Sequence, residues 1–529
     1  FIMYPIFLIL YRSVIHGDTG ALTLQNFAHF FAKKFYWGTM VNSLKVTVVS
    51  TILSAALGLP LAYLMRSVKI KGSSFLNILI VISYLSPPFI GAYAWIQMLG
   101  RQGVITQFLN DTFGLHYGGV YGFAGIVLVF TLQSFPLVYI YVSGALKNLD
   151  NSLNEAAESL GCSRMGRIWK IIVPLVMPTL LASSMLVFMR VFADFGTPML
   201  IGEGYKTLPV LIYNQFMGEV SGDDGFAAAI CCIVIGLTIV MFFVQRFLAG
   251  RNTYAMTALR PMAAESLGGL RNILAHLAVY MVVGLAILPQ FVVVYTSFLA
   301  TNGGQVFTGG FALQSYDATL FAKDNDVIWH TYFLGLCAIA AVLVLGVLIA
   351  YLSVRKRNTL NSILDVITMF PFIIPGSVLG IAFVFAFNKS PIILTGMALI
   401  MIISFAVRRM PYTVRSSTAI LGNISPSIEE AAISLGASDM TTFRKITVPM
   451  MMPGVLSGAI MSWVTIISEL SSSIILYTNS TQTLTVSIYT EVIRGNYGNA
   501  SAYATILMVT SILSLLLFYK VTGRRDVSV

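Results

Sequence analysis

The stretch YFLGLCAIAAVLVLGVLIAYL, from Tyr332 to Leu352, contains no charged residue. It is long enough to cross the hydrocarbon core of a bilayer as a helix, which takes about 20 residues. Similar apolar stretches recur along the chain, the clearest of them at 41–64, 75–99, 225–247, 274–298 and 502–519. With shorter stretches included, and a first one cut short at Phe1, the sequence predicts about 12 transmembrane helices. The predicted fold class is an all-α, polytopic membrane protein.

Composition and charge support a chain surrounded by lipid. Of the 529 residues, 57% are hydrophobic and 10% are charged, against about 25% charged residues in a typical soluble domain. The net charge of +11 does not indicate a nucleic-acid partner, because the basic residues gather in alternate loops, as at 355–357 and 408–415. Such alternation marks the cytoplasmic loops of membrane proteins. The C-terminus is predicted to lie on the same side.

The chain is an internal repeat. One set of residues recurs at a fixed displacement of 275 positions. The first copy consists of Glu155, Ala156, Ala157, Gly161, Pro174 and Pro178, and the second of Glu430, Ala431, Ala432, Gly436, Pro449 and Pro453. Earlier in each half the displacement is 288, and Gly58, Ala62, Tyr63, Leu64 and Pro87 recur as Gly346, Ala350, Tyr351, Leu352 and Pro375. The sequence therefore indicates a tandem duplication.

The repeat predicts the organisation of the chain. An even number of spans in each unit gives both copies the same orientation, so we expect two parallel repeats of six helices. The predicted parts are a first repeat at 1–249, a cytoplasmic linker at 250–271 and a second repeat at 272–529. Both repeated loops then face the cytoplasm.

The repeated loops carry a recognisable motif: Glu-Ala-Ala, three residues, Gly, nine residues, then Ile-x-Val-Pro. It resembles the cytoplasmic loop of the integral-membrane subunits of binding-protein-dependent ABC importers, in which Leu stands in place of Val173 and Val448. The Ala pair and Leu160 or Leu435 would form a short helix with a small apolar face, and Gly161 or Gly436 would permit a sharp turn after it. Such a helix can lie in a groove of a partner. An ordinary amphipathic loop helix is the alternative, and two copies at matched spacing favour docking.

The resemblance implies a type I ABC importer permease in the bacterial inner membrane. It also implies two partners: an ATPase subunit, expected as a homodimer that binds the two loops, and an extracytoplasmic substrate-binding protein. The chain has no Gly-x-x-x-x-Gly-Lys-Ser/Thr loop, so it lacks the usual means of holding nucleotide. ATP and Mg are expected on the separate ATPase. The chain itself is predicted to be a transport subunit without catalytic residues or a cofactor.

The substrate is predicted less directly. The double length, with the segments 193–198 and 469–471, resembles the fused permeases of ferric iron importers, and thiamine and phosphonate importers are near relatives. Asp194 and Glu469 are displaced by 275 positions and fall at equivalent depths within predicted spans. Acids at such places are functional candidates, and carboxylate oxygens suit a hard cation. They are candidates for the translocation path.

Two alternatives to a cation path stay open. Arg190 lies one helical turn before Asp194, so the acid would neutralise this cation if both lay on one helix. The second repeat has Thr465 in place of Arg190, and an unpaired guanidinium would suit a phosphate or phosphonate substrate. Arg190 is therefore a third candidate for the path.

The repeated outer segments Thr207-Leu208 and Thr483-Leu484 lie in loops that also carry charged residues: Glu203, Glu219, Asp223, Asp224, Glu491 and Arg494. These loops suggest a docking surface for the binding protein, with plain solvated loops as the alternative. An ion-coupled secondary transporter would also show repeats and buried acids, but it has no need of two matched docking loops. A membrane enzyme would need a cluster of His, Cys or acids. The histidines and cysteines are scattered, and the sequence assigns no metal site.

Overall fold

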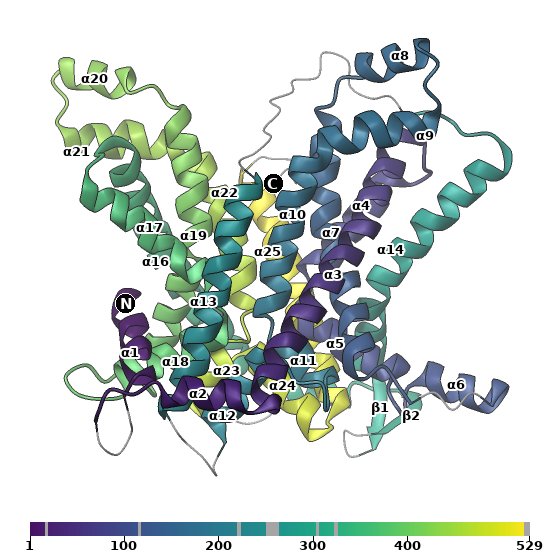
Figure 1. Cartoon of the computed structure of the whole chain (residues 1–529), viewed down its shortest axis with the longest axis horizontal. Coiled ribbons are helices and arrows are strands. Elements are labelled where there is room, and N and C mark those ends of the chain that lie inside the picture. The colour runs from purple at the N-terminus through teal and green to yellow at the C-terminus, as the bar shows by residue number, and fades with distance from the viewer. Residues whose placement is uncertain are drawn as a thin grey trace. The chain divides into compact units, whose positions relative to one another are not determined.

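A computed structural model of the chain describes residues 1–15, 20–114, 118–218, 224–249, 264–302, 306–321 and 326–522. Most of the predicted linker, 250–263, and the last residues of the predicted cytoplasmic C-terminus, 523–529, lie outside the described residues. The described part is almost entirely helical (Figure 1). It also contains one antiparallel strand pair, β1 (Leu299–Asn302) and β2 (Val306–Phe311), which the sequence did not predict.

The first half of the chain consists of helices of very different length. In order they are α1 (Met3–Ser13), α2 (Gln25–Ala32), α3 (Lys34–Ser67), α4 (Ser73–Leu85), α5 (Pro88–Leu99), α6 (Val104–Phe113), α7 (Gly122–Lys147), α8 (Ser152–Ser159), α9 (Arg164–Arg167), the π-helical turn η1 (Ile168–Ile172), α10 (Val173–Ala193), α11 (Gly196–Ile201), α12 (Leu208–Met217) and α13 (Asp224–Ala249).

The second half repeats this order. Its elements are α14 (Gly269–Ser297), the two strands, α15 (Gln314–Leu320), α16 (Val327–Arg355), α17 (Thr359–Ile373), α18 (Gly376–Phe387), α19 (Ala398–Asn423), α20 (Ser427–Ser434), α21 (Asp439–Thr442), η2 (Phe443–Thr447), α22 (Val448–Ile467), α23 (Ser473–Leu476), η3 (Asn479–Thr481), α24 (Leu484–Arg494) and α25 (Tyr497–Thr522). By position in the repeat α3 corresponds to α16, α7 to α19, α8 to α20, α10 to α22 and α13 to α25.

The number of spans in the described residues is smaller than the predicted twelve. Eight helices are long and apolar enough to cross a membrane, or ten if the bent pairs α4–α5 and α17–α18 each count as one span. The second pair bends by 115° at Pro375, since proline interrupts helical hydrogen bonding. The two remaining predicted spans are α1, which has 11 residues, and α19, which has 26. Arg408, Arg409 and Arg415 make α19 too polar to count by composition.

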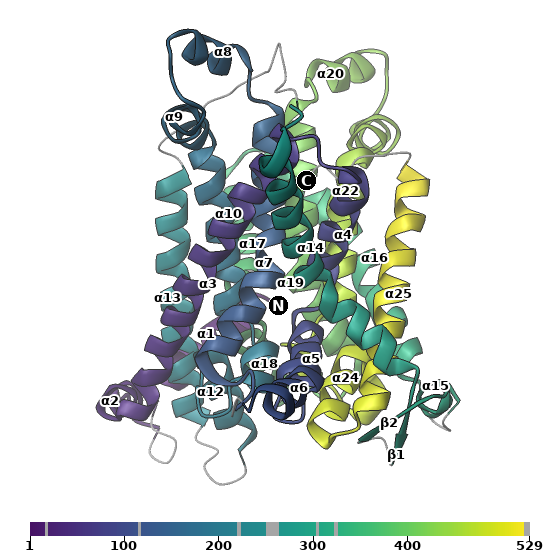
Figure 2. The same cartoon turned by 90° about the vertical axis from the view of Figure 1, so that its right-hand side faces the viewer.

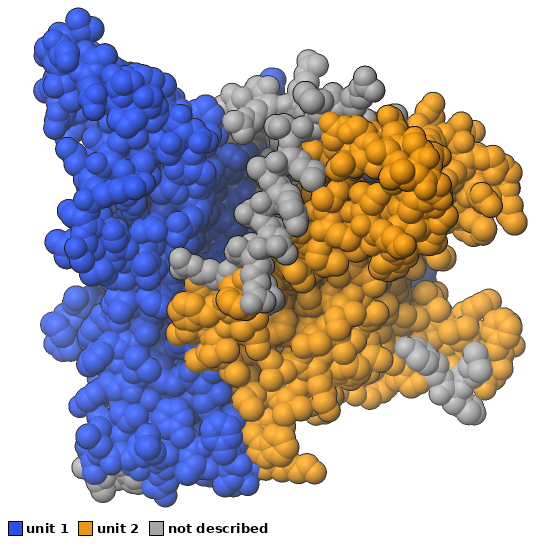
Figure 3. Space-filling model, turned by 45° about the horizontal axis from the view of Figure 1, so that its top comes forward, with its two compact units in different colours: residues 1–33, 212–235, 297–525 blue, residues 34–211, 236–296, 526–529 orange. Residues whose placement is uncertain are grey.

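The compact units of the structure do not follow the two repeats. One unit contains residues 1–33, 212–235 and 297–525, and the other contains 34–211, 236–296 and 526–529 (Figure 3). The first helix of each repeat thus packs within the unit that consists mainly of the other repeat. In the first unit the ring of Phe1, just before α1, lies 5.6 Å from the ring of Phe387 in α18. The predicted boundaries of the sequence repeat stay a prediction.

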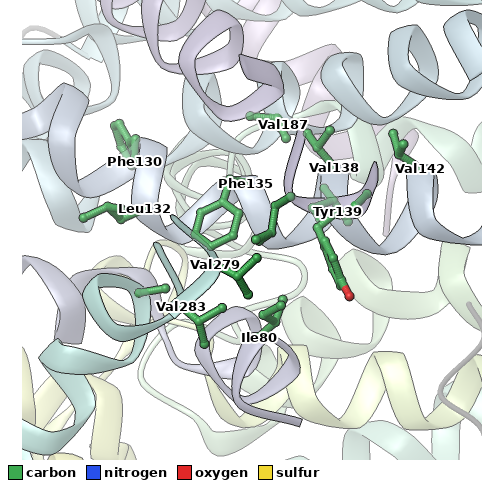
Figure 4. Close-up of a cluster of buried hydrophobic side chains, with 14 of the residues drawn as sticks. Ile80, Phe130, Leu132, Phe135, Val138, Tyr139, Val142, Val187, Val279 and Val283 are labelled. Carbon is green, nitrogen blue, oxygen red and sulfur yellow. The ribbon is translucent and has the colours of Figure 1, made fainter. Parts of the chain in front are cut away.

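In the second unit, α14 packs into a large apolar cluster. Val279 and Val283 of α14 pack with Ile80 of α4 and with Phe135 and Val138 of α7 (Figure 4). In a bilayer, contacts between helices depend on close packing more than on exclusion of water. Small residues permit it here: a Cβ on Gly58 of α3 would lie only 2.7 Å from the Cβ of Val138.

Candidate functional site

The two repeated loops, which begin with α8 and α20, are called the first and second docking loops after their predicted role. In the first docking loop, Gly161 of the motif follows the end of α8. Gly161 has a φ of +79°, in the left-handed region that favours glycine. Its N–H donates to the carbonyl oxygen of Glu158 (2.9 Å), and the N–H of Cys162 donates to that of Ala157 (2.9 Å). These two bonds form a Schellman motif, which satisfies carbonyls at a helix end. The chain then enters α9, where the Ser163 hydroxyl caps the N–H of Gly166.

The second docking loop has the same construction. Gly436, with a φ of +88°, donates to the carbonyl oxygen of Ile433 (2.9 Å), and Ala437 donates to that of Ala432 (3.0 Å). Ser438 caps α21 as Ser163 caps α9. The repeated motif therefore specifies a repeated local structure, including the π-helical turns η1 and η2 just before Pro174 and Pro449. Proline cannot donate a backbone hydrogen bond, which removes one bond from the regular ladder there.

The exposed part of each loop differs in one respect from the prediction. The second alanine of each pair, Ala157 or Ala432, is buried, so only the first is exposed to a partner. Leu160 and Leu435, which directly follow α8 and α20, are 87% and 89% exposed. An exposed leucine at the end of a polar helix is a usual anchor for a partner's groove.

Each loop exposes a second apolar residue that was not predicted from the sequence. Met165 and Met440 are displaced by the same 275 positions as the motif, and both are largely exposed. Each lies in the four-residue helix after the glycine turn. Their identity at equivalent positions was the signal that could have found them.

The acids Asp194 and Glu469 lie just beyond the ends of long helices, not within them. Helix α10 ends at Ala193 and α22 ends at Ile467. In each case the carboxylate accepts a hydrogen bond from the backbone N–H three residues later: Thr197 for Asp194 (2.9 Å) and Ser472 for Glu469 (3.2 Å). Each acid therefore holds the turn that follows its long helix. Within each unit this turn and the docking loop lie at opposite ends (Figure 1, Figure 2).

Glu469 is also the centre of an ion-pair cluster. Its side chain is almost fully buried, and its two carboxylate oxygens pair with Arg408 and Arg409 of α19. Ser472 donates to the same carboxylate through its hydroxyl (3.3 Å). Arg408 lies against Gly376, where a Cβ would meet its Nη1 at 1.5 Å. A carboxylate held by two guanidinium groups is not presented to a passing cation, so the cluster favours a structural or counter-ion role for Glu469.

Arg190 and Asp194 have other contacts in addition to any pairing with each other. The guanidinium of Arg190 lies 4.8 Å from the centre of the Tyr84 ring, a cation–π distance. Asp194 has an extended backbone (ψ of 130°) and lies just after the end of α10. Arg190 and Asp194 are therefore not one turn apart on the same helix, contrary to what the sequence predicted. Asp194 also lines a small cavity with Ser43, Thr47 and Thr207. Whether these residues touch substrate stays a prediction.

The outer Thr-Leu segments are not a docking surface. Thr207, Leu208, Thr483 and Leu484 are all buried. The N–H of Leu208 donates to the hydroxyl of Ser43 in α3 (2.7 Å), and that of Leu484 donates to the hydroxyl of Thr331 in α16 (2.8 Å). These four buried residues therefore do not form a docking surface themselves, and the docking role of the loops around them stays a prediction. Of the charged residues in those loops, Glu219 and Asp223 lie outside the described residues. Their repetition reflects equivalent hydrogen bonds within each half.

Within the described ranges of the chain, no three His, Cys, Asp or Glu residues lie close enough together to hold a metal ion. In each half the structure shows a set of long apolar helices, an exposed loop with the repeated motif and a polar turn after a long helix. Together these features define a duplicated membrane permease.

Comparison with known proteins gives the family. The model of the binding-protein-dependent transport system inner membrane component matches residues 54–254 and again 342–525, and the chain belongs to this family. It is thus an integral protein of the inner membrane and the permease of an ABC importer, with two permease repeats fused in one chain. It is a transport subunit and not an enzyme.

Relatives of both lengths are known. The ferric transport system permease protein FbpB of Actinobacillus pleuropneumoniae is 30% identical over 534 residues, which cover 99% of this chain and 76% of that protein. A putative ferric transport system permease protein of Haemophilus influenzae is 30% identical over 91% of this chain and 76% of its own length. The molybdenum transport system permease protein ModB of Escherichia coli is 28% identical over 40% of this chain but 93% of its own length. It thus corresponds to a single repeat.

Proposed function

We propose that this chain carries ferric iron across the inner membrane, from an extracytoplasmic binding protein to the cytoplasm, with energy from a separate ATPase. The observation that supports iron is the similarity over almost the whole chain to two permeases named for ferric transport. The loops of α8 and α20 are the proposed contacts with the ATPase, on the cytoplasmic side where the basic residues gather.

The equivalence of the loops supports an ATPase homodimer. Both loops present a leucine and a methionine at equivalent positions, Leu160 with Met165 and Leu435 with Met440, all exposed. Two copies of one ATPase offer two identical grooves, and two loops of the same local structure can fill them. ATP and Mg would bind to those subunits.

An oxyanion is the second candidate substrate. The cluster of Arg408, Arg409 and Glu469 has a formal charge of +1, which repels a bare cation and attracts an anion. The single-repeat relative is named for molybdenum transport, and the sequence left phosphonates open. Relatedness over the full chain favours iron.

The test is uptake into proteoliposomes that contain the chain with the ATPase, with the binding protein outside. Ferric iron, molybdate, a phosphonate and thiamine are offered one at a time, with and without internal ATP. Iron uptake that needs both ATP and the binding protein supports the proposal. Uptake of an oxyanion alone would replace iron by the second candidate. Uptake driven by an ion gradient without ATP would overturn the importer assignment.

A further inference from the structure

The second docking loop is fastened to a transmembrane helix by a shielded ion pair. Arg355, the last residue of α16, lies with its Nε 2.9 Å from the Oε1 of Glu429, in the first turn of α20. The two side chains are only 10% and 13% exposed. Arg355 also donates through Nη2 to the carbonyl oxygen of Ile424 (2.8 Å), just before the loop.

A third element joins the same carboxylate. The hydroxyl of Thr447, at the end of η2, donates to the Oε1 of Glu429 (3.1 Å). At the start of η2, the ring of Phe443 lies 4.7 Å from the ring of Tyr351 in α16. The end of α16, the start of α20 and the turn that leads into α22 are therefore held together at one point. Shielding from water makes such a joint stiffer than a surface ion pair, which water and salt weaken.

The first docking loop has no such joint. The residues at the positions equivalent to Arg355, Glu429 and Thr447 are Ser67, Asn154 and Ile172, so neither an ion pair nor the threonine bond can form. Among the described residues, the Ser67 hydroxyl and the Asn154 Oδ1 are buried without a hydrogen-bond partner.

The first loop is instead paired to the helix that follows it, Arg164–Ala193. Glu158 of α8 pairs with Arg167 of α9, and Asn151 donates to Glu155 (2.8 Å). The positions equivalent to Glu158 and Arg167 are Ile433 and Thr442. The two loops therefore share their backbone structure, and each is paired to a helix that continues into a span. Among the described residues, the second loop alone has a shielded ion pair to the preceding span of its repeat, α16, and Glu158 in the first loop is 65% exposed.

We propose that Arg355, Glu429 and Thr447 are positioning residues that make the second loop the stiffer of two unequal links between ATPase and permease. A push on α20 is then passed directly to α16 as well as to the following helix, whereas a push on α8 passes to the following helix through the more exposed pair of Glu158 and Arg167. This inference rests on the proposed docking of an ATPase to both loops. It predicts that identical ATPase subunits contribute unequally to transport.

The experiment measures three quantities on the full chain reconstituted with the ATPase and binding protein: co-purification of the ATPase, ATP hydrolysis, and substrate taken up per ATP hydrolysed. Glu429→Gln and Arg355→Gln should leave co-purification intact and lower uptake per ATP at least fivefold. Thr447→Val should lower it about twofold. Arg355→Lys, which keeps the charge but loses the bond to Ile424, should be intermediate.

Two comparisons separate a positioning role from general damage. Asp365→Asn removes the more exposed pair between Asp365 and Arg415 (3.3 Å), outside both loops, and should leave all three quantities unchanged. Glu158→Gln removes the pair within the first loop and should lower uptake per ATP less than Glu429→Gln does. The reversed pair Arg355→Glu with Glu429→Arg should recover part of the loss.

The outcomes distinguish this inference from the function it rests on. Failure of the unmodified chain to bind an ATPase would remove the proposed function itself. An ATPase that binds, with Glu429→Gln equal to the unmodified chain in uptake per ATP, would overturn only the unequal link. Equal losses for Glu158→Gln and Glu429→Gln would overturn it as well. If Glu429→Gln yields too little folded protein, Arg355→Lys and Thr447→Val decide, and full uptake per ATP in both contradicts the inference.

Discussion

Gly161 and Gly436 matter for their backbone conformation and not for space. Both have positive φ, and a Cβ at either position would meet nothing within 4 Å. The sequence predicted a sharp turn at both glycines. The structure gives the physical reason, since any side chain meets the same strain there, about 1–2 kcal/mol for the left-handed region.

We therefore expect Gly161→Ala and Gly436→Ala to weaken binding of the ATPase nearly as much as replacement by Leu does. Asn, which tolerates the left-handed region, should be milder. Affinity for the ATPase subunit, measured on purified protein, checks the order. Normal affinity in the Ala variants with a loss only for Leu would show that bulk matters after all.

The acids Asp194 and Glu469 should respond differently to neutralisation. Glu469→Gln leaves Arg408 and Arg409 largely buried without their shared carboxylate, and loss of one partner of a buried ion pair costs about 3–5 kcal/mol. Asp194→Asn keeps an oxygen that can accept from Thr197, so the turn is retained and we expect a smaller cost than for Glu469→Gln.

Thermal unfolding in detergent, followed alongside uptake, tests this difference. A large loss of stability only for Glu469→Gln supports the ion-pair role. Reduced uptake by stable Asp194→Asn protein would support a place in the translocation path. Equal stability of the two variants would contradict the assignment of the cluster.

At the scale of the helix, close approach depends on glycines that the repeat revealed. Gly58 permits contact between α3 and α7, and Gly346 permits contact between α16 and α19, where a Cβ would lie 2.9 Å from the Cγ2 of Thr413. Gly284 of α14 is helical too, but a Cβ there would meet nothing within 4 Å. These three positions separate packing from helix propensity.

Gly58→Ala and Gly346→Ala should each destabilise the protein by about 1–3 kcal/mol, because overpacking displaces the facing helix. Gly284→Ala is the matched control and should be neutral or stabilising by up to about 1 kcal/mol, since alanine is the better helix former. The midpoint of thermal unfolding in detergent is the measurement. A destabilised Gly284→Ala protein, or unchanged Gly58→Ala, would argue against packing as the cause.

At the scale of the whole chain, the duplication joins two permease repeats in one polypeptide without a nucleotide-binding loop. Such a chain is free to let its two docking loops diverge, because each position is encoded separately. The difference between Glu429 and Asn154 is an instance of that freedom. The first helices of the two repeats are also exchanged between the compact units. Helix α1 packs in the unit that consists mainly of the second repeat, and α14 packs in the unit that consists mainly of the first.

The purified chain should hydrolyse no ATP by itself and should support hydrolysis only with an added ATPase, with two copies per chain. Phosphate release and the mass of the reconstituted complex measure the two expectations. A chain with exposed leucines removed, Leu160→Ser with Leu435→Ser, is the control and should bind the ATPase poorly. Hydrolysis by the isolated chain would contradict its role as a transport subunit.

The sequence alone determined the membrane class, the duplication and the construction of both docking loops, because these depend on residues close together in the chain. Apolar runs of span length, proline and a glycine after a short helix act locally, so a repeated motif yields the same cap twice. For the same reason the family could be recognised from the loops, and Asp194 and Glu469 could be selected as a pair.

Only the tertiary structure decided what those acids contact, which outer residues are buried and how the loops are anchored. Arg408 and Glu469 are separated by 61 positions, and Arg355 and Glu429 by 74. Whether such side chains meet depends on the rotation and crossing of whole helices, which no local pattern specifies. The exchange of α1 and α14 has the same origin, since an apolar helix can satisfy its own hydrogen bonds anywhere in the bilayer and is placed only by the surface against which it packs.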